Sequence, residues 1–194
     1  MFTGIITHTG SFRAYAQGKS QICIQAPLLA DRLNLGDSLA VNGVCLSMIR
    51  REREELCFNL SSETLKKTTL GSLKKGELLN LELPLTLSSP LGGHLVTGHI
   101  DGIGKVNRVI PKSGGKRFLV SFPPELRPYF VPKGSVALDG VSLTTAALTR
   151  STLEVEAIPI TLAQSTLGSW KPGRTVNLEC DIIGKYVYNW TVKS

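Results

Sequence analysis

The chain of 194 residues contains one sequence pattern twice, and this repeat decides how the chain divides into folding units. Residues 36–47 read GDSLAVNGVCLS and residues 133–144 read KGSVALDGVSLT, with five of the twelve positions identical. At the same offset of 97 residues, segments 58–84 and 155–181 share eleven of 27 positions. A colinear series of matches of this kind indicates a tandem duplication.

The beginnings of the two copies also correspond. Phe-Thr-Gly-Ile-Ile at 2–6 matches Val-Thr-Gly-His-Ile at 96–100, at an offset of 94 residues. We therefore place the junction near residues 88–95. Each copy has about 95 residues, which is too long for a solenoid repeat and typical of a small domain.

Both copies have the hydrophobic pattern of short β-strands, because apolar residues alternate along runs bounded by Gly, Pro and Asn. The runs are 21–26, 38–49, 55–60 and 78–85 in the first copy, and 105–110, 117–122, 135–148, 153–158 and 175–182 in the second. One short helix is predicted in each copy, over 62–73 and 161–167. Such closely spaced strands are typical of an antiparallel barrel or sandwich, so the chain is predicted to be all-β, with two similar small barrels.

The composition is that of a globular protein, with 42% hydrophobic and 19% charged residues. No run reaches the roughly 18 apolar residues that span a bilayer, so we expect no membrane association. The first residues lack the basic and apolar regions of a signal peptide. We therefore expect a cytoplasmic protein.

The formal net charge of +7 permits an anionic partner such as nucleic acid. However, the basic residues are scattered as short pairs, and aromatic residues make up only 6% of the chain. Nucleic-acid-binding barrels place exposed aromatic side chains in a basic groove. We therefore expect no nucleic-acid partner.

The four cysteines, Cys23, Cys45, Cys57 and Cys180, form no C-x-x-C pair. A zinc ribbon and a thioredoxin motif are thereby excluded. Reduced thiols are expected in a cytoplasm, and Cys23 and Cys57 are interpreted as ordinary small apolar residues.

Two tight turns precede pairs of small polar residues. Asn-Gly at 42–43 and Asp-Gly at 139–140 favour the positive φ of such turns. Side chains two residues apart on a strand share a face. The pairs are Cys45 with Ser47, and Ser142 with Thr144.

The histidines do not have the spacing of a metal site. His94 and His99 flank the predicted first strand of the second copy, on its opposite faces, and their spacing differs from the i, i+4 spacing of a helical zinc pair. His8 has no evident partner. No metal is therefore expected.

Taken together, these motifs resemble riboflavin synthases with duplicated lumazine-binding domains. The matching segments are MFTGII, NGVCLS, GGHLVTGHIDG, DGVSLT and the two T-L-G…K-x-G…N-L-E blocks, in order, over about residues 1–186. The resemblance implies two tandem six-stranded Greek-key β-barrels and a short C-terminal helix. The expected domains are 1–94, 95–183 and a helix or tail at 184–194.

The resemblance also implies an activity. Enzymes of this family convert two molecules of 6,7-dimethyl-8-ribityllumazine into riboflavin and 5-amino-6-(ribitylamino)uracil, the last step of riboflavin biosynthesis. One lumazine donates a four-carbon unit to the other, and no cofactor takes part. The family implies a homotrimer with the active site between barrels of neighbouring subunits, and we also expect association with lumazine synthase.

The expected reaction begins when the C7 methyl group of one lumazine loses a proton and a nucleophile adds to C7 of the other. Cys45 is the best side-chain candidate for this nucleophile, because a thiolate is intrinsically reactive. An activated water molecule is the alternative. His94 and His99 are candidates for proton transfer.

By resemblance, the candidate catalytic residues are Cys45, His99, His94, Ser142, Phe2, Ser38 and Asp181. The expected pocket of the first barrel is lined by Gly4, Ile5, Ile6, Cys45, Leu46, Ser47, Asn59, Leu60, Ser61, Ser62, Glu63 and Thr64. The expected pocket of the second barrel is lined by Gly98, His99, Ile100, Ser142, Leu143, Thr144, Ile158, Pro159, Ile160, Thr161, Leu162 and Ala163. Lys133 is expected to reach the site across a subunit interface.

The two copies differ at chemically important positions, as an unsymmetrical reaction requires. Cys45 corresponds to Ser142, and Glu63 corresponds to Ile160, where the family commonly has Glu. A non-catalytic lumazine- or flavin-binding protein of the same fold is the alternative function.

Overall fold

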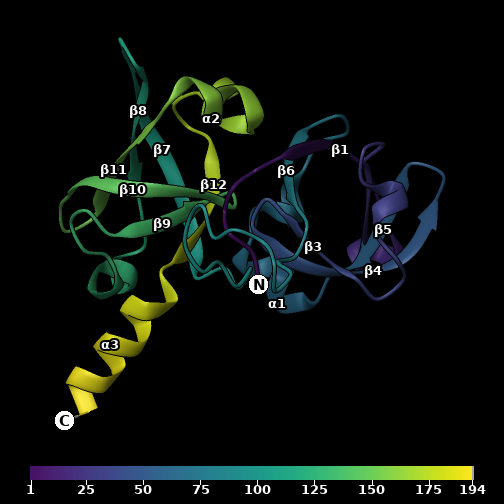
Figure 1. The fold of residues 1–194 in the computed structure, drawn as a ribbon, viewed down its shortest axis with the longest axis horizontal. Helices are drawn as coiled ribbons and strands as arrows, with labels where there is room; N and C mark the ends of the chain where they lie inside the picture. The colour runs from purple at the N-terminus through teal and green to yellow at the C-terminus, as the bar shows by residue number, and fades with distance from the viewer. Residues whose placement is uncertain (194) are drawn as a thin grey trace.

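The computed structural model describes residues 1–193, which form two closed six-stranded barrels followed by a helix (Figure 1). We call the barrel of β1 to β6 the N-barrel and the barrel of β7 to β12 the C-barrel. Their strand orders, β1-β2-β5-β4-β3-β6 and β7-β8-β11-β10-β9-β12, are equivalent. In each, three consecutive strands are followed by a fourth that pairs with the first of the three, which is the Greek-key arrangement. The predicted fold is confirmed.

The strands are short, and adjacent strands pair antiparallel. The N-barrel strands are β1 (His8–Ala16), β2 (Gln21–Gln25), β3 (Ser38–Val41), β4 (Val44–Glu52), β5 (Glu55–Asn59) and β6 (Leu78–Glu82). The C-barrel strands are β7 (Gly102–Lys112), β8 (Gly115–Ser121), β9 (Ser135–Leu138), β10 (Val141–Leu148), β11 (Thr152–Ala157) and β12 (Thr175–Cys180).

Two long predicted runs, 38–49 and 135–148, are each a hairpin of two strands. The Asn-Gly and Asp-Gly turns divide them, and both residues of each turn have positive φ. The sequence pattern missed β1, whose alternation is interrupted by Gly10 and by a bulge between Phe12 and Ala14. The predicted strand between His94 and His99 is also wrong, because this segment forms only an isolated bridge between Val96 and Phe2.

The predicted helices are shorter than expected. In the N-barrel, α1 (Ser62–Lys67) is followed by a 3-10 turn, Thr69–Ser72. Thr68 separates them in an extended conformation and its side chain caps the 3-10 turn. In the C-barrel, α2 (Pro159–Gln164) is followed in the same way by the 3-10 turn Thr166–Ser169. Further 3-10 turns span Gln17–Lys19, Ala30–Arg32 and Pro124–Tyr129.

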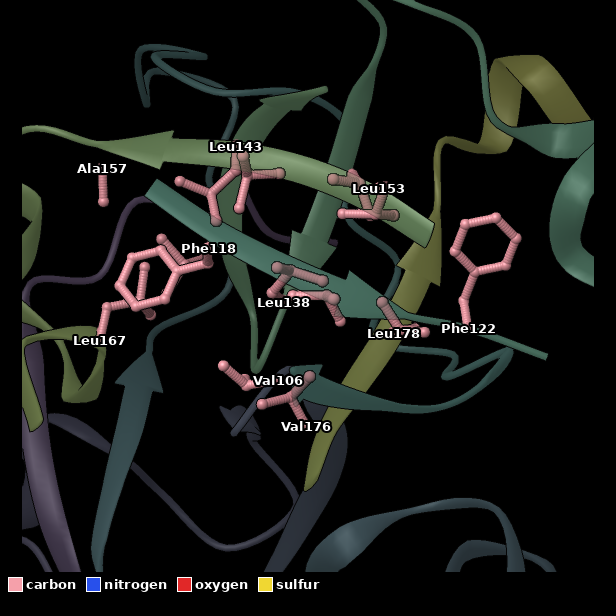
Figure 2. Close-up of a cluster of buried hydrophobic side chains, with 14 of the residues drawn as sticks. Val106, Phe118, Phe122, Leu138, Leu143, Leu153, Ala157, Leu167, Val176 and Leu178 are labelled. Atoms are coloured by element: carbon pink, nitrogen blue, oxygen red, sulfur yellow. The ribbon is translucent and has the colours of Figure 1, made fainter. Parts of the chain in front are cut away.

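Each barrel has a hydrophobic core of its own. Inward-facing residues of alternate positions, such as Ile22, Ile24 and Phe58, fill the N-barrel. Figure 2 shows the corresponding core of the C-barrel, where Phe118 and Leu138 lie between the strands. Each core also takes in one residue of the other copy, because Ile6 is buried in the C-barrel core and Ile100 packs against the N-barrel core.

Hydrogen bonds between the two copies join the barrels. Asn80 on β6 donates from Nδ2 to the backbone oxygen of Asp139 (2.9 Å), and Asn177 on β12 donates to the backbone oxygen of Asn42 (2.8 Å). These four residues are all buried. The two donors, Asn80 and Asn177, are the asparagines of the repeated N-L-E motif. Each copy therefore makes the same contact to the other copy.

Cys23 and Cys57 form a disulfide bond, so the expectation of four reduced thiols is wrong for this pair. They lie opposite each other on the antiparallel strands β2 and β5, with their Cα atoms 4.1 Å apart. Because side chains alternate between the two faces of a strand, both cysteines point away from the apolar core of the barrel. The register between β2 and β5 then brings their sulfur atoms together. Cys45 and Cys180 are free.

The C-terminal helix α3 (Ile182–Lys193) extends away from the C-barrel (Figure 1). Its first turn is attached by an ion pair between Lys185 and Asp101 (2.6 Å), and Tyr188 packs edge-on against Tyr129. Within the described residues, no helix has the length and apolar character needed to cross a membrane.

Candidate active site

Two short segments cross between the barrels. We call residues 2–6 the N-arm and residues 96–100 the linker arm. They pair antiparallel through two backbone hydrogen bonds between Phe2 and Val96, of 2.7 and 3.1 Å. Beyond this bridge each arm contacts the barrel of the other copy. Ser142 on β10 donates its backbone N–H to Gly4 (2.8 Å), and Cys45 on β4 donates to Gly98 (2.9 Å).

A cavity of about 270 Å³ lies where the linker arm meets the N-barrel, and we call it the Cys45 pocket. Strand β4, helix α1 and the linker arm supply its walls. The lining residues are Val44, Cys45, Ser61, Glu63, Thr64, Lys67, Thr68, Gly98, His99 and Ile100.

A second, narrower cavity of about 50 Å³ lies where the N-arm meets the C-barrel, and we call it the Ser142 pocket. It is lined by Gly4, Ile5, Ile6, Val141, Ser142, Thr161, Gln164 and Ser165. Every one of these residues has its repeat equivalent in the Cys45 pocket. The duplication has therefore produced two related pockets with different side chains.

The arms are exchanged relative to the sequence-based expectation. Gly4, Ile5 and Ile6 were expected beside Cys45, but they line the Ser142 pocket. Gly98, His99 and Ile100 were expected in the pocket of the second barrel, but they line the Cys45 pocket. The repeat aligns the arms with each other but carries no information about which barrel each arm contacts.

The Cys45 pocket combines a free thiol with charged and polar groups. Cys45 is half-buried, whereas His99 is exposed at the rim. Glu63 and Lys67, one turn apart on α1, form an ion pair of 3.1 Å across the exposed side. A polar ligand placed here would meet a nucleophile, an imidazole and both signs of charge.

The Ser142 pocket has a hydrogen-bonded pair beside it. His94 Nδ1 and Ser142 Oγ are 2.7 Å apart. His94 is buried, and its Nε2 atom has no hydrogen-bond partner among the described residues. Burial lowers the pKa of His94, while the charge of Asp181 opposes that shift. The imidazole is therefore neutral at pH 7 and can accept a proton.

The other predicted catalytic residues do not line either cavity. Phe2 is fully buried between the barrels with Ala40 and Val96. Ser38 lies opposite Ser47 on the β3–β4 hairpin. Lys133, which is expected to bind substrate across a subunit interface, also lines neither cavity and is exposed in a turn with a positive φ.

Asp181 has a structural contact as well as its proximity to His94. Its carboxylate accepts the backbone N–H of Ile183 (3.0 Å) and so caps the first turn of α3. Asp181 therefore links the helix to the neighbourhood of the Ser142 pocket.

Several predicted substrate-binding residues lie outside both cavities. Leu46 and Leu60 are buried in the N-barrel core, and Leu143 is buried in the C-barrel core (Figure 2). Leu162 packs against that second core. The remaining ones are exposed outside the cavities: Ser47, Asn59, Ser62, Thr144, Ile158, Pro159, Ile160 and Ala163.

The sequence reasoning missed one wall of each pocket. Lys67 and Thr68 lie three and four residues after Thr64, so they share a face with it on and just beyond α1. Helical spacing from Thr64 was the signal that could have found them, and the repeat then gives Gln164 and Ser165.

The pockets do not have the composition of a metal site. In the described part of the chain, the one group with the spacing of metal ligands is Cys23, Glu55 and Cys57. It lies on the outside of the N-barrel, and its two sulfur atoms are joined in the disulfide. A disulfide offers no thiolate ligands.

Comparison with known proteins agrees with the duplicated architecture. The family model described as the lumazine binding domain matches twice, at residues 3–84 and 97–181. The riboflavin synthase of Actinobacillus pleuropneumoniae is 38% identical over 195 residues, which cover 100% of this chain and 91% of that protein. The riboflavin synthase of Mycobacterium tuberculosis (strain ATCC 25618 / H37Rv) is 37% identical over 193 residues, 96% of each chain.

Solved structures share the fold. The crystal structure of LumP complexed with riboflavin has a TM-score of 0.86 at 22% identity and covers 93% of this chain and 99% of that chain. LumP complexed with 6,7-dimethyl-8-(1'-D-ribityl) lumazine has a TM-score of 0.83 at 21% identity, over 92% and 98%.

The two matched domains and the two crossed pockets define the class: the chain belongs to the family of lumazine-binding-domain proteins. Full-length identity places it within that family among the riboflavin synthases, which are transferases. Its function is that of a riboflavin synthase.

Proposed function

We propose that the Cys45 pocket and the Ser142 pocket each bind one molecule of 6,7-dimethyl-8-ribityllumazine, and that the reaction joins these two molecules. The observation that carries this proposal is the repeat equivalence of the two linings. Two identical substrates need two related sites. An unsymmetrical reaction needs those sites to differ, and they do at Cys45 and Ser142.

The lumazine in the Cys45 pocket receives the nucleophile at C7. The Cys45 thiol is free and half-buried on the wall of the cavity, so it can reach a bound ring. The thiolate adds to C7, and the electron pair moves into the ring. Water activated beside His99 is the alternative nucleophile.

The lumazine in the Ser142 pocket loses a proton from its C7 methyl group. The neutral imidazole of His94 accepts this proton, directly or through the Ser142 hydroxyl 2.7 Å away. The resulting carbanion is delocalised into the lumazine ring and attacks the activated partner. As the new ring closes, the bond between the nucleophile and C7 breaks and releases the Cys45 thiolate. Expulsion of 5-amino-6-(ribitylamino)uracil from the same lumazine then completes the four-carbon transfer.

A homotrimer brings the two kinds of pocket together. Within one chain the two cavities have no lining residue in common, and the proposed trimer places the Cys45 pocket of one chain against the Ser142 pocket of a neighbour. Helix α3 supports this assembly, because exposed apolar residues at 183, 186, 187 and 190 follow one helical stripe. A cytoplasmic location and association with lumazine synthase belong to the same proposal.

The nucleophile is tested by comparing Cys45→Ser with Cys180→Ala. Cys180 is a free but fully buried thiol that lines neither cavity, so its loss controls for removal of a cysteine. We expect Cys45→Ser to lower kcat by about 10²-fold or more, and Cys180→Ala to change it little. Equal kcat values for Cys45→Ser and wild type would assign the addition to water.

A further inference from the structure

Two buried carboxylates hold the crossed arms. Glu82 at the end of β6 and Glu179 near the end of β12 are repeat equivalents, with 6% and 1% of their surfaces exposed. Neither has an ion-pair partner within 4.0 Å among the described residues. A buried carboxylate without a cation needs hydrogen-bond donors. The arms provide these donors.

The two sets of contacts are nearly identical. Glu82 accepts the backbone N–H of Thr3 (2.7 Å), the Thr3 hydroxyl (2.6 Å) and the backbone N–H of Gly4 (3.0 Å). Glu179 accepts the same three groups from Thr97 and Gly98, at 2.6, 2.6 and 3.0 Å. In each case one carboxylate oxygen accepts both hydrogen bonds from the threonine, and the other oxygen accepts the backbone N–H of the glycine. An amide side chain would turn an N–H group towards one of these donors.

Because the arms cross, each carboxylate acts on the pocket of the opposite barrel. Glu82 belongs to the N-barrel, yet the arm that it holds continues into the Ser142 pocket. Glu179 belongs to the C-barrel, yet its arm continues into the Cys45 pocket.

The fit between arm and reacting residue is tight. A Cβ atom on Gly98 would lie 2.5 Å from Cys45 Cβ, and one on Gly4 would lie 2.6 Å from Ser142 Cβ. Both glycines have positive φ, so backbone freedom is also required there. A small shift of either arm therefore moves a wall that touches the reacting side chain.

We propose that Glu82 and Glu179 are positioning residues, each of which holds in place the arm that completes the pocket of the other barrel. This assignment rests on the proposed use of the two pockets. It predicts a crossed pattern: loss of the Glu179 contacts weakens binding at Cys45, and loss of the Glu82 contacts weakens binding at Ser142.

The test uses Cys45 as its own reporter. Iodoacetamide alkylates Cys45, and riboflavin, used as the probe, slows that alkylation when it occupies the pocket. Half-maximal protection is compared in wild type, Glu179→Gln and Glu82→Gln, with thermal denaturation alongside. The two variants lose equivalent contacts, and the thermal denaturation curves compare their effects on folding.

We expect Glu179→Gln to need about tenfold more riboflavin for half-protection, and Glu82→Gln to stay within about twofold of wild type. Glu82→Gln should nevertheless lose turnover, because its effect falls on the other substrate. Equal loss of protection in both variants, or no loss in either, would overturn the positioning assignment.

The threonine variants and the wild-type protection experiment serve as further controls. If a Gln variant does not fold, Thr97→Val and Thr3→Val remove the hydroxyl of each arm, which donates to the carboxylate and accepts the backbone N–H of His99 or Ile5. These variants keep both backbone hydrogen bonds to the carboxylate and should show the same crossed pattern with a smaller effect. If riboflavin does not protect Cys45 in the wild-type protein, the proposed pocket fails, and that result is separate from failure of the crossed pattern.

Discussion

At the scale of single residues, the two copies differ at the buried position Asp139, whose equivalent is Asn42. Both accept a backbone N–H from an asparagine of the N-L-E motif, at 2.8 Å. Burial raises the pKa of Asp139 to about 6, although the charge of Arg174, 3.4 Å away, opposes the rise. A neutral amide meets the same hydrogen-bond requirement without the cost of a buried charge.

Asp139→Asn should therefore remove a pH dependence of stability. Between its ordinary pKa of 3.8 and about 6, the folded protein holds a proton on Asp139 that the unfolded chain has released. Wild-type stability thus falls as pH rises through this range. We expect the Tm of Asp139→Asn minus that of wild type to increase from pH 4 to pH 7 and then level off. A difference that does not change with pH would contradict the shift.

At the scale of elements, the sequence could predict what local patterns determine. Alternating apolar residues located most strands, and Asn-Gly and Asp-Gly placed the two hairpin turns. Strand β1 was missed because a glycine and a bulge interrupt its pattern. The arms were misplaced because their partners, Cys45 and Ser142, lie far away in sequence on the other copy's barrel. The pairing of Cys23 with Cys57 likewise depends on register between strands.

The disulfide between β2 and β5 gives a prediction at the same scale. Thiol titration of the denatured, unreduced protein should count only Cys45 and Cys180, and reduction should add Cys23 and Cys57. Reduction opens a loop of 34 residues and should destabilise the protein by about 3–4 kcal/mol. A double variant with Ala at both positions should not respond to reductant. Four reactive thiols before reduction would contradict the bond.

At the scale of the whole molecule, crossing of the arms makes the two barrels depend on each other. The Cys45 pocket takes one wall from the N-barrel and another from the arm of the second copy. The Ser142 pocket takes one wall from the C-barrel and another from the arm of the first copy. The reciprocal asparagine bonds hold the barrels together around this crossing. The gene duplication therefore did more than double a binding site, because neither pocket is complete in one copy alone.

The proposed trimer is tested on helix α3. Val187→Glu places a charge on the exposed apolar stripe, whereas Asn189→Glu places the same charge two residues further along the helix, at a position outside the stripe. We expect Val187→Glu to shift the mass in light scattering from three chains to one and to abolish turnover. Asn189→Glu should remain trimeric and active. Monomeric wild-type protein with full activity would exclude a site shared between subunits.

The central claim is that two like molecules react with each other, one in each kind of pocket. The most direct measurement mixes the purified protein with 6,7-dimethyl-8-ribityllumazine and a chelator, with no other additive, and follows both compounds over many turnovers. We predict two lumazines consumed for each riboflavin formed. Tight binding with altered lumazine fluorescence and no riboflavin would contradict the claim and leave a binding protein of the same fold.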